Sequence, residues 1–158
     1  MGYKNHKDTR IAESEEDTIS IVIPVYNEEV VLREFHDRLI RALEPLKEKI
    51  EILYVDDGSK DSSWTILSHL HTTDSKVGIL RFSRNFGKEQ AMSAGLHRAQ
   101  GQAIIVIDAD LQDPPELIPS MVETWRKGAD VINMHRISRE GETWFKKLTS
   151  YLFYRVLN

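Results

Sequence analysis

The sequence predicts an α/β protein built on a mostly parallel sheet that is flanked by helices. Short runs rich in β-branched residues alternate with segments whose apolar residues recur at helical spacing, which is the pattern of right-handed βαβ units. The strand runs are also almost continuously apolar, as expected for a parallel sheet whose two faces are both covered. The chain shows no internal repeat and no low-complexity linker.

The elements can be placed in order from residue 19. Strands are expected at 19–26, 51–57, 77–83, 102–110 and 129–135. Helices are expected at 28–46, about 61–71, 88–99 and 115–128. The helix at 88–99 is rich in small residues, which favours close packing on a sheet.

Length and composition exclude several classes of protein. The 158 residues suffice for one domain with a real core, and 41% hydrophobic with 29% charged residues is typical of a globular chain. A formal net charge of -4 gives no general footprint for nucleic acid. The absence of cysteine excludes disulfides, thiolate metal sites and a cysteine nucleophile.

The two ends of the chain differ from its middle. Residues 1–18 are polar, without the apolar core of a signal peptide, and we expect a disordered leader. Residues 141–158 carry an apolar stripe at helical spacing with Lys146, Lys147 and Arg155 beside it. This amphipathic helix either packs on the sheet or lies in a membrane interface. Its pattern has no stop signal, so we expect it to begin a missing C-terminal membrane part.

Polar residues gather where the predicted strands end, which is where open parallel sheets bind ligands. The first strand leads to Tyr26 and Glu28, and the second leads to Asp56 and Asp57. Further along the chain, the strand ends lead to Asn85 and Lys88, Asp108 and Asp110, and His135 and Arg136. This clustering is the strongest signal of a ligand site in the sequence.

The carboxylates at this edge admit two interpretations. Asp56, Asp57, Asp108 and Asp110 would repel one another unless a cation neutralises them, and oxygen ligands favour Mg²⁺ or Mn²⁺. Alternatively, aspartates here cap turns and helices, which is the interpretation we favour for Asp61 and Asp113. For the alternating pair Asp108 and Asp110 we favour the metal, because a cap needs only one carboxylate.

Other side chains at this edge suit a nucleotide. The Tyr26 ring offers a face for a base, Glu28 or Asp57 offers acceptors for base or ribose, and basic residues such as Lys88 and Arg136 could neutralise a diphosphate. Taken singly, each residue has an ordinary structural explanation at a strand end or helix start. No glycine-rich phosphate loop and no G-x-S-x-G element occurs, which argues against dehydrogenases, P-loop NTPases and α/β-hydrolases.

Taken together, these segments resemble family 2 glycosyltransferases, whose GT-A fold is Rossmann-like. The resemblance covers about 19–158. Within the family, it is closer to the branch that acts on polyprenyl phosphates, such as dolichol-phosphate mannose synthases and undecaprenyl-phosphate glucosyltransferases. It rests on an ordered set of motifs: VIPVYNEE, VDDGSKDSSW, RNFGKEQAMSAGLHRAQGQAIIVIDADLQDPPE and GADVINMHR. On this resemblance 19–140 is the catalytic domain.

The resemblance implies roles for individual residues. Asp108, Ala109 and Asp110 form a D-x-D element, in which Asp110 and Gln112 bind Mg²⁺ or Mn²⁺ and Asp108 lies near the sugar or ribose. The implied catalytic residues are Asp108, Asp110 and Arg136, where Arg136 contacts the donor diphosphate. The remaining implied donor contacts are Pro24, Tyr26, Glu28, Val55 and Asp57.

The implied reaction is inverting transfer of a sugar, with glucose from UDP-glucose as the best choice, to undecaprenyl phosphate at the cytoplasmic face of the cell membrane. The terminal helix would touch the bilayer, no nucleic acid is involved, and a homo-oligomer of the full-length protein is compatible with the resemblance. Alternatives are a processive polysaccharide synthase and a non-catalytic nucleotide-sugar-binding module. A haloacid-dehalogenase-like phosphatase fits less well, because Gln112 replaces its Thr or Val and the motif follows the fourth strand.

Overall fold

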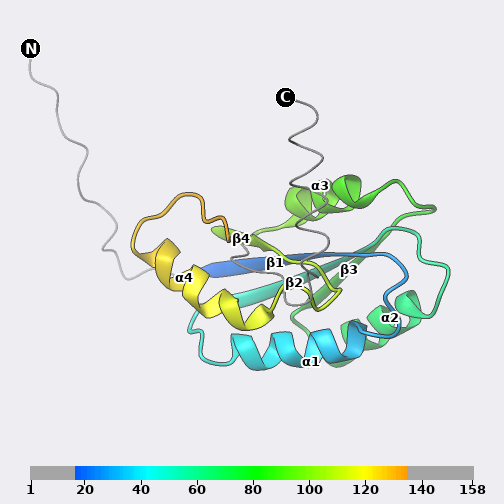
Figure 1. Cartoon of the computed structure of the whole chain (residues 1–158), viewed down its shortest axis with the longest axis horizontal. Helices are drawn as coiled ribbons and strands as arrows, with labels where there is room; N and C mark the ends of the chain where they lie inside the picture. Colours follow the sequence, from blue (N-terminus) through cyan, green and yellow to red (C-terminus); the bar gives the residue numbers. More distant parts are fainter. Residues whose placement is uncertain (1–16, 135–158) are drawn as a thin grey trace, which may run out of the picture.

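The computed structural model describes residues 17–134, which form a four-stranded sheet between two unequal layers of helices (Figure 1). The sheet order is β3-β2-β1-β4, and every neighbouring pair is parallel. The expected α/β fold with a mostly parallel sheet is therefore confirmed. The strands are β1 (Thr18–Val25), β2 (Lys49–Asp56), β3 (Val77–Arg81) and β4 (Ala103–Val106).

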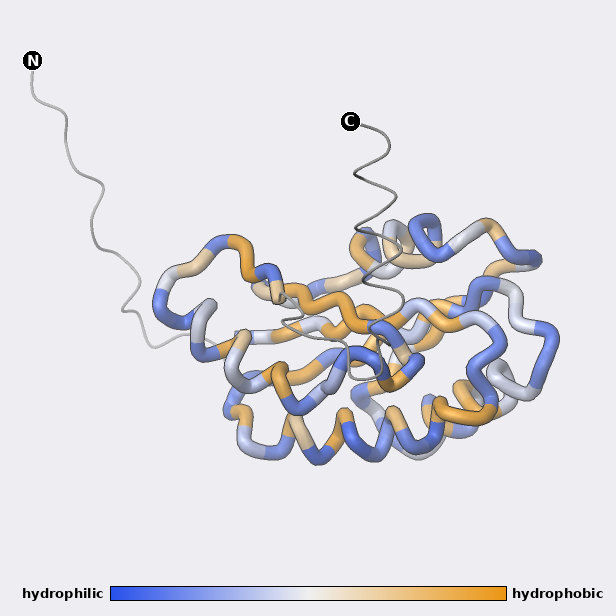
Figure 2. Tube along the Cα trace, in the orientation of Figure 1, coloured by the Kyte–Doolittle hydropathy of each residue, from blue (hydrophilic) through white to orange (hydrophobic). Residues whose placement is uncertain are grey.

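The helices divide unequally between the two faces of the sheet (Figure 1). Among the described helices, only α3 (Lys88–Arg98) covers one face. The other face carries α1 (Leu32–Leu43), α2 (Ser63–Thr73), the 3₁₀ turn η1 (Pro115–Leu117) and α4 (Ile118–Arg126). The main core fills this second interface, where Ile21 and Ile23 of β1 meet Phe35 and Leu39 of α1. Figure 2 accordingly shows the strands as largely hydrophobic.

Helix α3 lies very close to the sheet because it contains a glycine at the point of contact. A Cβ added to Gly95 would lie 2.3 Å from Cγ1 of Val22 in β1 and 3.3 Å from Cγ2 of Val55 in β2. Real atoms do not approach so closely, so a larger residue would push the helix away. The close packing expected from the small residues of this helix is thus confirmed.

Several predicted elements are shorter in the structure, most clearly the first helix and the fourth strand. The first helix begins at Leu32 rather than residue 28, because Asn27 has φ 56° and the backbone amides of Glu28 and Glu29 donate to side chains of another loop. The fourth strand ends at Val106 rather than residue 110, although its inward–outward alternation of side chains continues beyond that point.

The predicted fifth strand at 129–135 is wrong over its described part, because residues 129–134 form no strand. This segment instead lines a cavity of about 220 Å³ together with β4 and α4, and Val131 is 87% exposed. A short run with the β-branched residues Val131 and Ile132 suggested a strand, but no described strand pairs with it. The predicted helix at 141–158, Arg136 and residues 1–16 of the predicted leader lie outside the described residues. Between residues 17 and 134, no helix has the length and apolar character needed to span a membrane.

Candidate functional site

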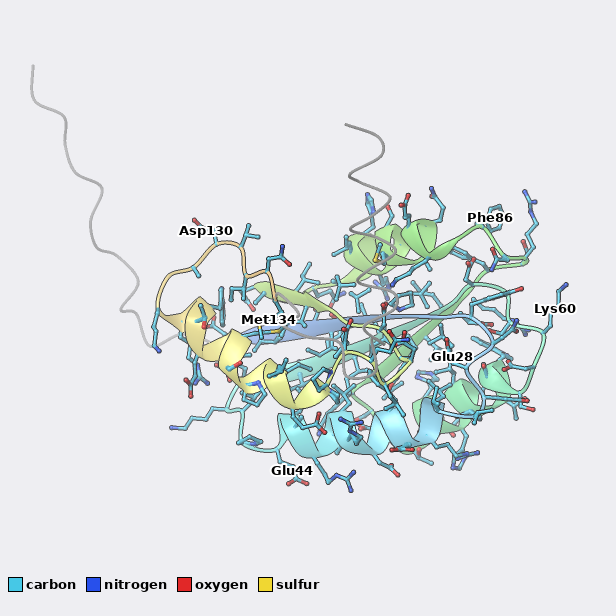
Figure 3. The ribbon with its side chains drawn as sticks, viewed as in Figure 1. Glu28, Glu44, Lys60, Phe86, Asp130 and Met134 are labelled. Carbon is cyan, nitrogen blue, oxygen red and sulfur yellow. The ribbon has the colours of Figure 1, made fainter. Side chains whose placement is uncertain are left out.

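A cavity of about 240 Å³ opens where β1, β2 and β4 end. Figure 3 shows Glu28 beside these strand ends, with Lys60 and Phe86 toward the same side of the molecule and Asp130 toward the opposite side. Among the lining side chains are seven of the predicted donor contacts: Pro24, Tyr26, Glu28, Asp57, Asp108, Ala109 and Asp110. Asn85 and Lys88 complete its polar wall.

Other predicted site residues lie elsewhere. Val55 is fully buried beneath α3 and does not line the cavity. Asp56 is also fully buried; its Oδ1 accepts the Ser59 amide at 3.0 Å, and Arg81 Nε lies 3.2 Å from its Oδ2. The Asp56 carboxylate therefore stabilises the β2 turn instead of joining an open set with Asp108 and Asp110. Gln112 is exposed outside the lining.

The loop after β1 and the loop after β2 are joined by reciprocal hydrogen bonds. The backbone amides of Asn27, Glu28 and Glu29 donate to Ser59 Oγ, Ser63 Oγ and Asp61 Oδ2 at 2.9–3.0 Å. In return, the amides of Lys60 and Ser62 donate to Asn27 Oδ1 and Glu29 Oε2, both at 2.8 Å. Most polar side chains of these two loops therefore hold the loops together, and few of their polar groups remain to contact a ligand.

Asp57 likewise holds the loop after β3 in place by accepting hydrogen bonds from its backbone. Its Oδ1 accepts the Phe86 amide at 2.7 Å, and its Oδ2 accepts the Gly87 amide at 2.9 Å. Next to it, Gly58 has φ 71°, and a Cβ at this position would lie 2.5 Å from the backbone carbon of Arg84. The carboxylate of Asp57 thus orients the loop that carries Asn85 and Lys88, and Asp57 also lines the cavity although it is only 2% exposed.

We call residues 107–117 the D-x-D loop. In its first part, side chains that pack on the core alternate with aspartates that face the cavity. Ile107, Ala109 and Leu111 pack into or against the hydrophobic core. The intervening Asp108 and Asp110 therefore face away from the core and line the cavity. The small Ala109, only 2% exposed, lets the backbone lie directly on the core between the two carboxylates.

Charges of both signs meet in the cavity. Lys88 Nζ, at the start of α3, lies 2.5 Å from Asp108 Oδ2. On the opposite wall, burial raises the pKa of the Glu28 carboxyl, and the negative charges of Asp110, Asp61 and Asp108 raise this pKa further. Glu28 is therefore part of an acidic group with Asp108 and Asp110, whereas the sequence led us to group these two aspartates with Asp56 and Asp57.

The oxygen ligands of this group fit a hard divalent cation bound together with a substrate. No cluster of three or more His, Cys, Asp or Glu side chains that could hold a metal occurs between residues 17 and 134. Mg²⁺, however, is commonly held by one or two carboxylates while phosphates and waters complete its shell. Asp110 supplies such a carboxylate at the cavity, and its Oδ1 accepts the Gln112 amide at 2.9 Å.

Comparisons with known proteins agree with this architecture. The family model described as "Glycosyl transferase family 2" matches residues 20–157. An uncharacterized glycosyltransferase of Bacillus subtilis, YkcC, is 53% identical over 139 residues, which are 88% of this chain and 43% of that protein. The prophage bactoprenol glucosyl transferase homolog of Escherichia coli K12 is 45% identical over 141 residues, which are 89% of this chain and 46% of that protein.

Solved structures show the same fold. A mannosyltransferase from Pyrobaculum calidifontis, in complex with GDP-Man and Mn²⁺, superposes with a TM-score of 0.64 at 20% identity, covering 89% of this chain and 42% of that one. The chain spans less than half the length of the curated relatives described above. A family model that matches almost all of residues 19–158 and relatives at this identity settle the classification. The chain belongs to glycosyltransferase family 2, with the GT-A fold.

Proposed function

We propose that this chain is the donor-binding catalytic domain of an inverting glycosyltransferase that moves glucose from UDP-glucose to a polyprenyl phosphate. The observation that carries the proposal is the single cavity at the strand ends, which joins an exposed aromatic ring, Tyr26, to the acidic pair Asp108 and Asp110. The class of acceptor follows from the names of relatives, which include bactoprenol glucosyl transferases at 43–45% identity.

The cavity offers distinct contacts for the parts of a nucleotide sugar. The Tyr26 ring, 39% exposed, provides a face for stacking of the base, with Pro24 beside it. Glu28 provides acceptors for hydroxyl or imide groups, and Asp57, whose oxygens already accept two backbone amides, remains a secondary proposed contact. Asp108 and Asp110 lie on the other wall, where we place the diphosphate and the sugar. Arg136, outside the described residues, remains a proposed contact of the diphosphate.

The charges near Asp108 suit a leaving diphosphate. Mg²⁺ or Mn²⁺ held by Asp110 and Gln112 would supply Lewis-acid stabilisation of that leaving group. Lys88 adds a cation of the chain itself, since its ammonium group lies in the same cavity and can turn from Asp108 toward a phosphate oxygen. A lipid phosphate is already anionic at neutral pH, so its attack on the anomeric carbon requires no general base from the chain. Direct in-line attack inverts that carbon.

The proposed setting is the cytoplasmic face of the cell membrane, where a polyprenyl phosphate presents its head group. The amphipathic segment at 141–158 would bring the domain to that surface through its apolar stripe and flanking lysines. This segment lies outside the described residues, and the membrane contact rests on the sequence pattern alone.

Calorimetry of the chain with UDP-glucose, GDP-mannose and UDP-GlcNAc, with and without Mn²⁺, tests donor binding. We expect metal-dependent binding, strongest for UDP-glucose, and its loss in Asp110→Asn, because an amide is a much poorer metal ligand than a carboxylate. The matched control is Glu123→Gln, an exposed charge on α4 outside the cavity lining.

Failure of every nucleotide sugar to bind would refute the transferase assignment, and unchanged binding in Asp110→Asn would refute the metal ligand. Transfer of radiolabelled sugar to undecaprenyl phosphate by the full-length protein then separates an enzyme from a non-catalytic binding module. A single transferred sugar supports the proposal, whereas polymer formation supports a processive synthase.

A further inference from the structure

The D-x-D loop adopts a backbone conformation that its own sequence does not favour. Leu111 has φ 63°, in the left-handed region that non-glycine residues rarely adopt. Such a residue is strained relative to ordinary backbone and persists only where its surroundings enforce it. One restraint is visible within the loop, because the Leu111 side chain packs against the core.

A second restraint comes from α1, on the far side of the loop from the cavity. Arg38 Nε donates to Glu116 Oε1 at 2.8 Å, and Arg38 Nη2 donates to Glu116 Oε2 at 2.9 Å. Glu116 belongs to η1, in which the buried Pro115 forms the first residue. The Arg38–Glu116 pair therefore fixes the end of the loop whose beginning is fixed by β4.

The Arg38–Glu116 pair affects the orientation of the loop more than it affects the free energy of unfolding. The Arg38 and Glu116 side chains are 26% and 52% exposed, and ion pairs at such positions add little to the free energy of unfolding. A planar guanidinium that binds both carboxylate oxygens, however, fixes the direction of its partner as well as the distance. The ring of Pro115 fixes φ directly before Glu116, so the placement of Glu116 is coupled to the backbone that precedes it in the D-x-D loop.

We infer that Arg38 and Glu116 are positioning residues, which hold the D-x-D loop in its ligand-ready shape before any ligand binds. Neither residue lines the cavity, and both act through the placement of Asp108 and Asp110. The consequence for ligand affinity rests on the proposed function, whereas the restraint on the loop does not.

Hydrogen–deuterium exchange of the unliganded chain tests the restraint. In Arg38→Met and in Glu116→Gln, we expect amides of the loop, such as Gln112 and Leu117, to exchange about fivefold faster, because local opening loses the contribution of one surface ion pair. The charge-swapped double variant Arg38→Glu with Glu116→Arg should restore most of the protection. Arg38→Lys should restore only part of it, because an ammonium lacks the planar fork.

The matched control is the other Arg–Glu pair of the helical layer, in which Arg126 Nε donates to Glu48 Oε1 at 2.6 Å. It ties the end of α4 to the segment before β2, and neither residue belongs to the D-x-D loop. Arg126→Met should leave exchange of the loop unchanged. Its melting temperature should fall at least as much as that of Arg38→Met, because the Glu48 side chain is only 8% exposed and loses its partner.

The second readout is donor affinity, measured by calorimetry with UDP-glucose and Mn²⁺, which we expect to weaken about fivefold in Arg38→Met and to recover in the charge swap. Unchanged loop exchange in Arg38→Met and Glu116→Gln, or equal acceleration in Arg126→Met, would overturn the positioning role. Faster exchange with wild-type donor affinity would overturn its link to binding. If the wild-type chain binds no nucleotide sugar, the proposed function fails, while the exchange data still decide whether the pair restrains the loop.

Discussion

The two loops that face each other across the cavity are stabilised in different ways. After β2, the buried carboxylates of Asp56 and Asp57 accept backbone amides, so these acids belong to the framework. After β4, the core holds Ile107, Ala109 and Leu111, while Asp108 and Asp110 face the cavity. Similar runs of aspartate thus have different roles, one structural and one facing the ligand site. A carboxylate whose oxygens are occupied by amides builds a site, whereas one held by its apolar neighbours remains available to a ligand.

The largest expected effect on stability comes from substitution of Gly58, which lies in the loop after β2. Gly58→Ala should lower the free energy of unfolding by about 3 kcal/mol or more, because the new Cβ would meet the Arg84 backbone at 2.5 Å in addition to the strain of φ 71°. Urea denaturation followed by circular dichroism measures this change. Donor binding should be lost as well, since the displaced loop carries Lys88.

Gly128→Ala is the control for backbone strain alone. Gly128 has φ 97°, but nothing lies within 4 Å of an added Cβ. The expected cost is about 1–2 kcal/mol. Equal costs for the two substitutions would show that the contact between the loops after β2 and β3 contributes nothing.

Substitutions of Asp57 and Asp108 should have smaller effects, which distinguish the aspartate that accepts backbone amides from the one that faces the cavity. Asp57→Asn should destabilise the chain by about 1–3 kcal/mol, because its amide group cannot accept the Phe86 and Gly87 amides on both sides. Asp108→Asn should change stability by less than about 1 kcal/mol, since it loses only the exposed contact with Lys88. Its effect should instead appear as weaker donor binding in calorimetry. A similar stability loss in both variants would contradict the distinction drawn between the two loops.

The sequence allowed the fold and most of the cavity to be predicted, because strand ends in a parallel sheet meet at one edge whatever the details of the loops. Tyr26, Glu28, Asp108 and Asp110 were all placed on that basis, and they line one cavity. The partners of Asp57 were not predictable, since the amides of Phe86 and Gly87 approach it only through the turn after β3.

The Arg38–Glu116 pair was not predictable either. Arg38 lies 78 positions from Glu116 on a helix whose polar residues look alike in sequence, so no local signal marks it. The fifth strand failed for a related reason: a short run with β-branched residues is compatible with a strand, but strand formation also requires a partner. Residues 129–134 have none among the described strands.

The smallest expected effect is a pH dependence that originates in the β1 loop. Burial and the charges of Asp110, Asp61 and Asp108 raise the pKa of Glu28, so between its ordinary and its raised pKa the folded chain binds more protons than the unfolded chain. Stability therefore falls as the pH rises through this window and stays lower above it. Glu28→Gln removes the titration, so the variant should be more stable than the wild type at neutral pH, by less than about 1 kcal/mol because Glu28 is partly exposed.

Urea denaturation between pH 4 and pH 8 measures this difference, which should vanish below the ordinary pKa of a glutamate, near 4.5. The same substitution in an Asp110→Asn background is the decisive control. If the acids across the cavity repel Glu28, removing the Asp110 charge must reduce the gain from Glu28→Gln. A gain of equal size in both backgrounds would show that the charge of Asp110 does not raise the pKa of Glu28, and that burial and the charges of Asp61 and Asp108 account for the shift.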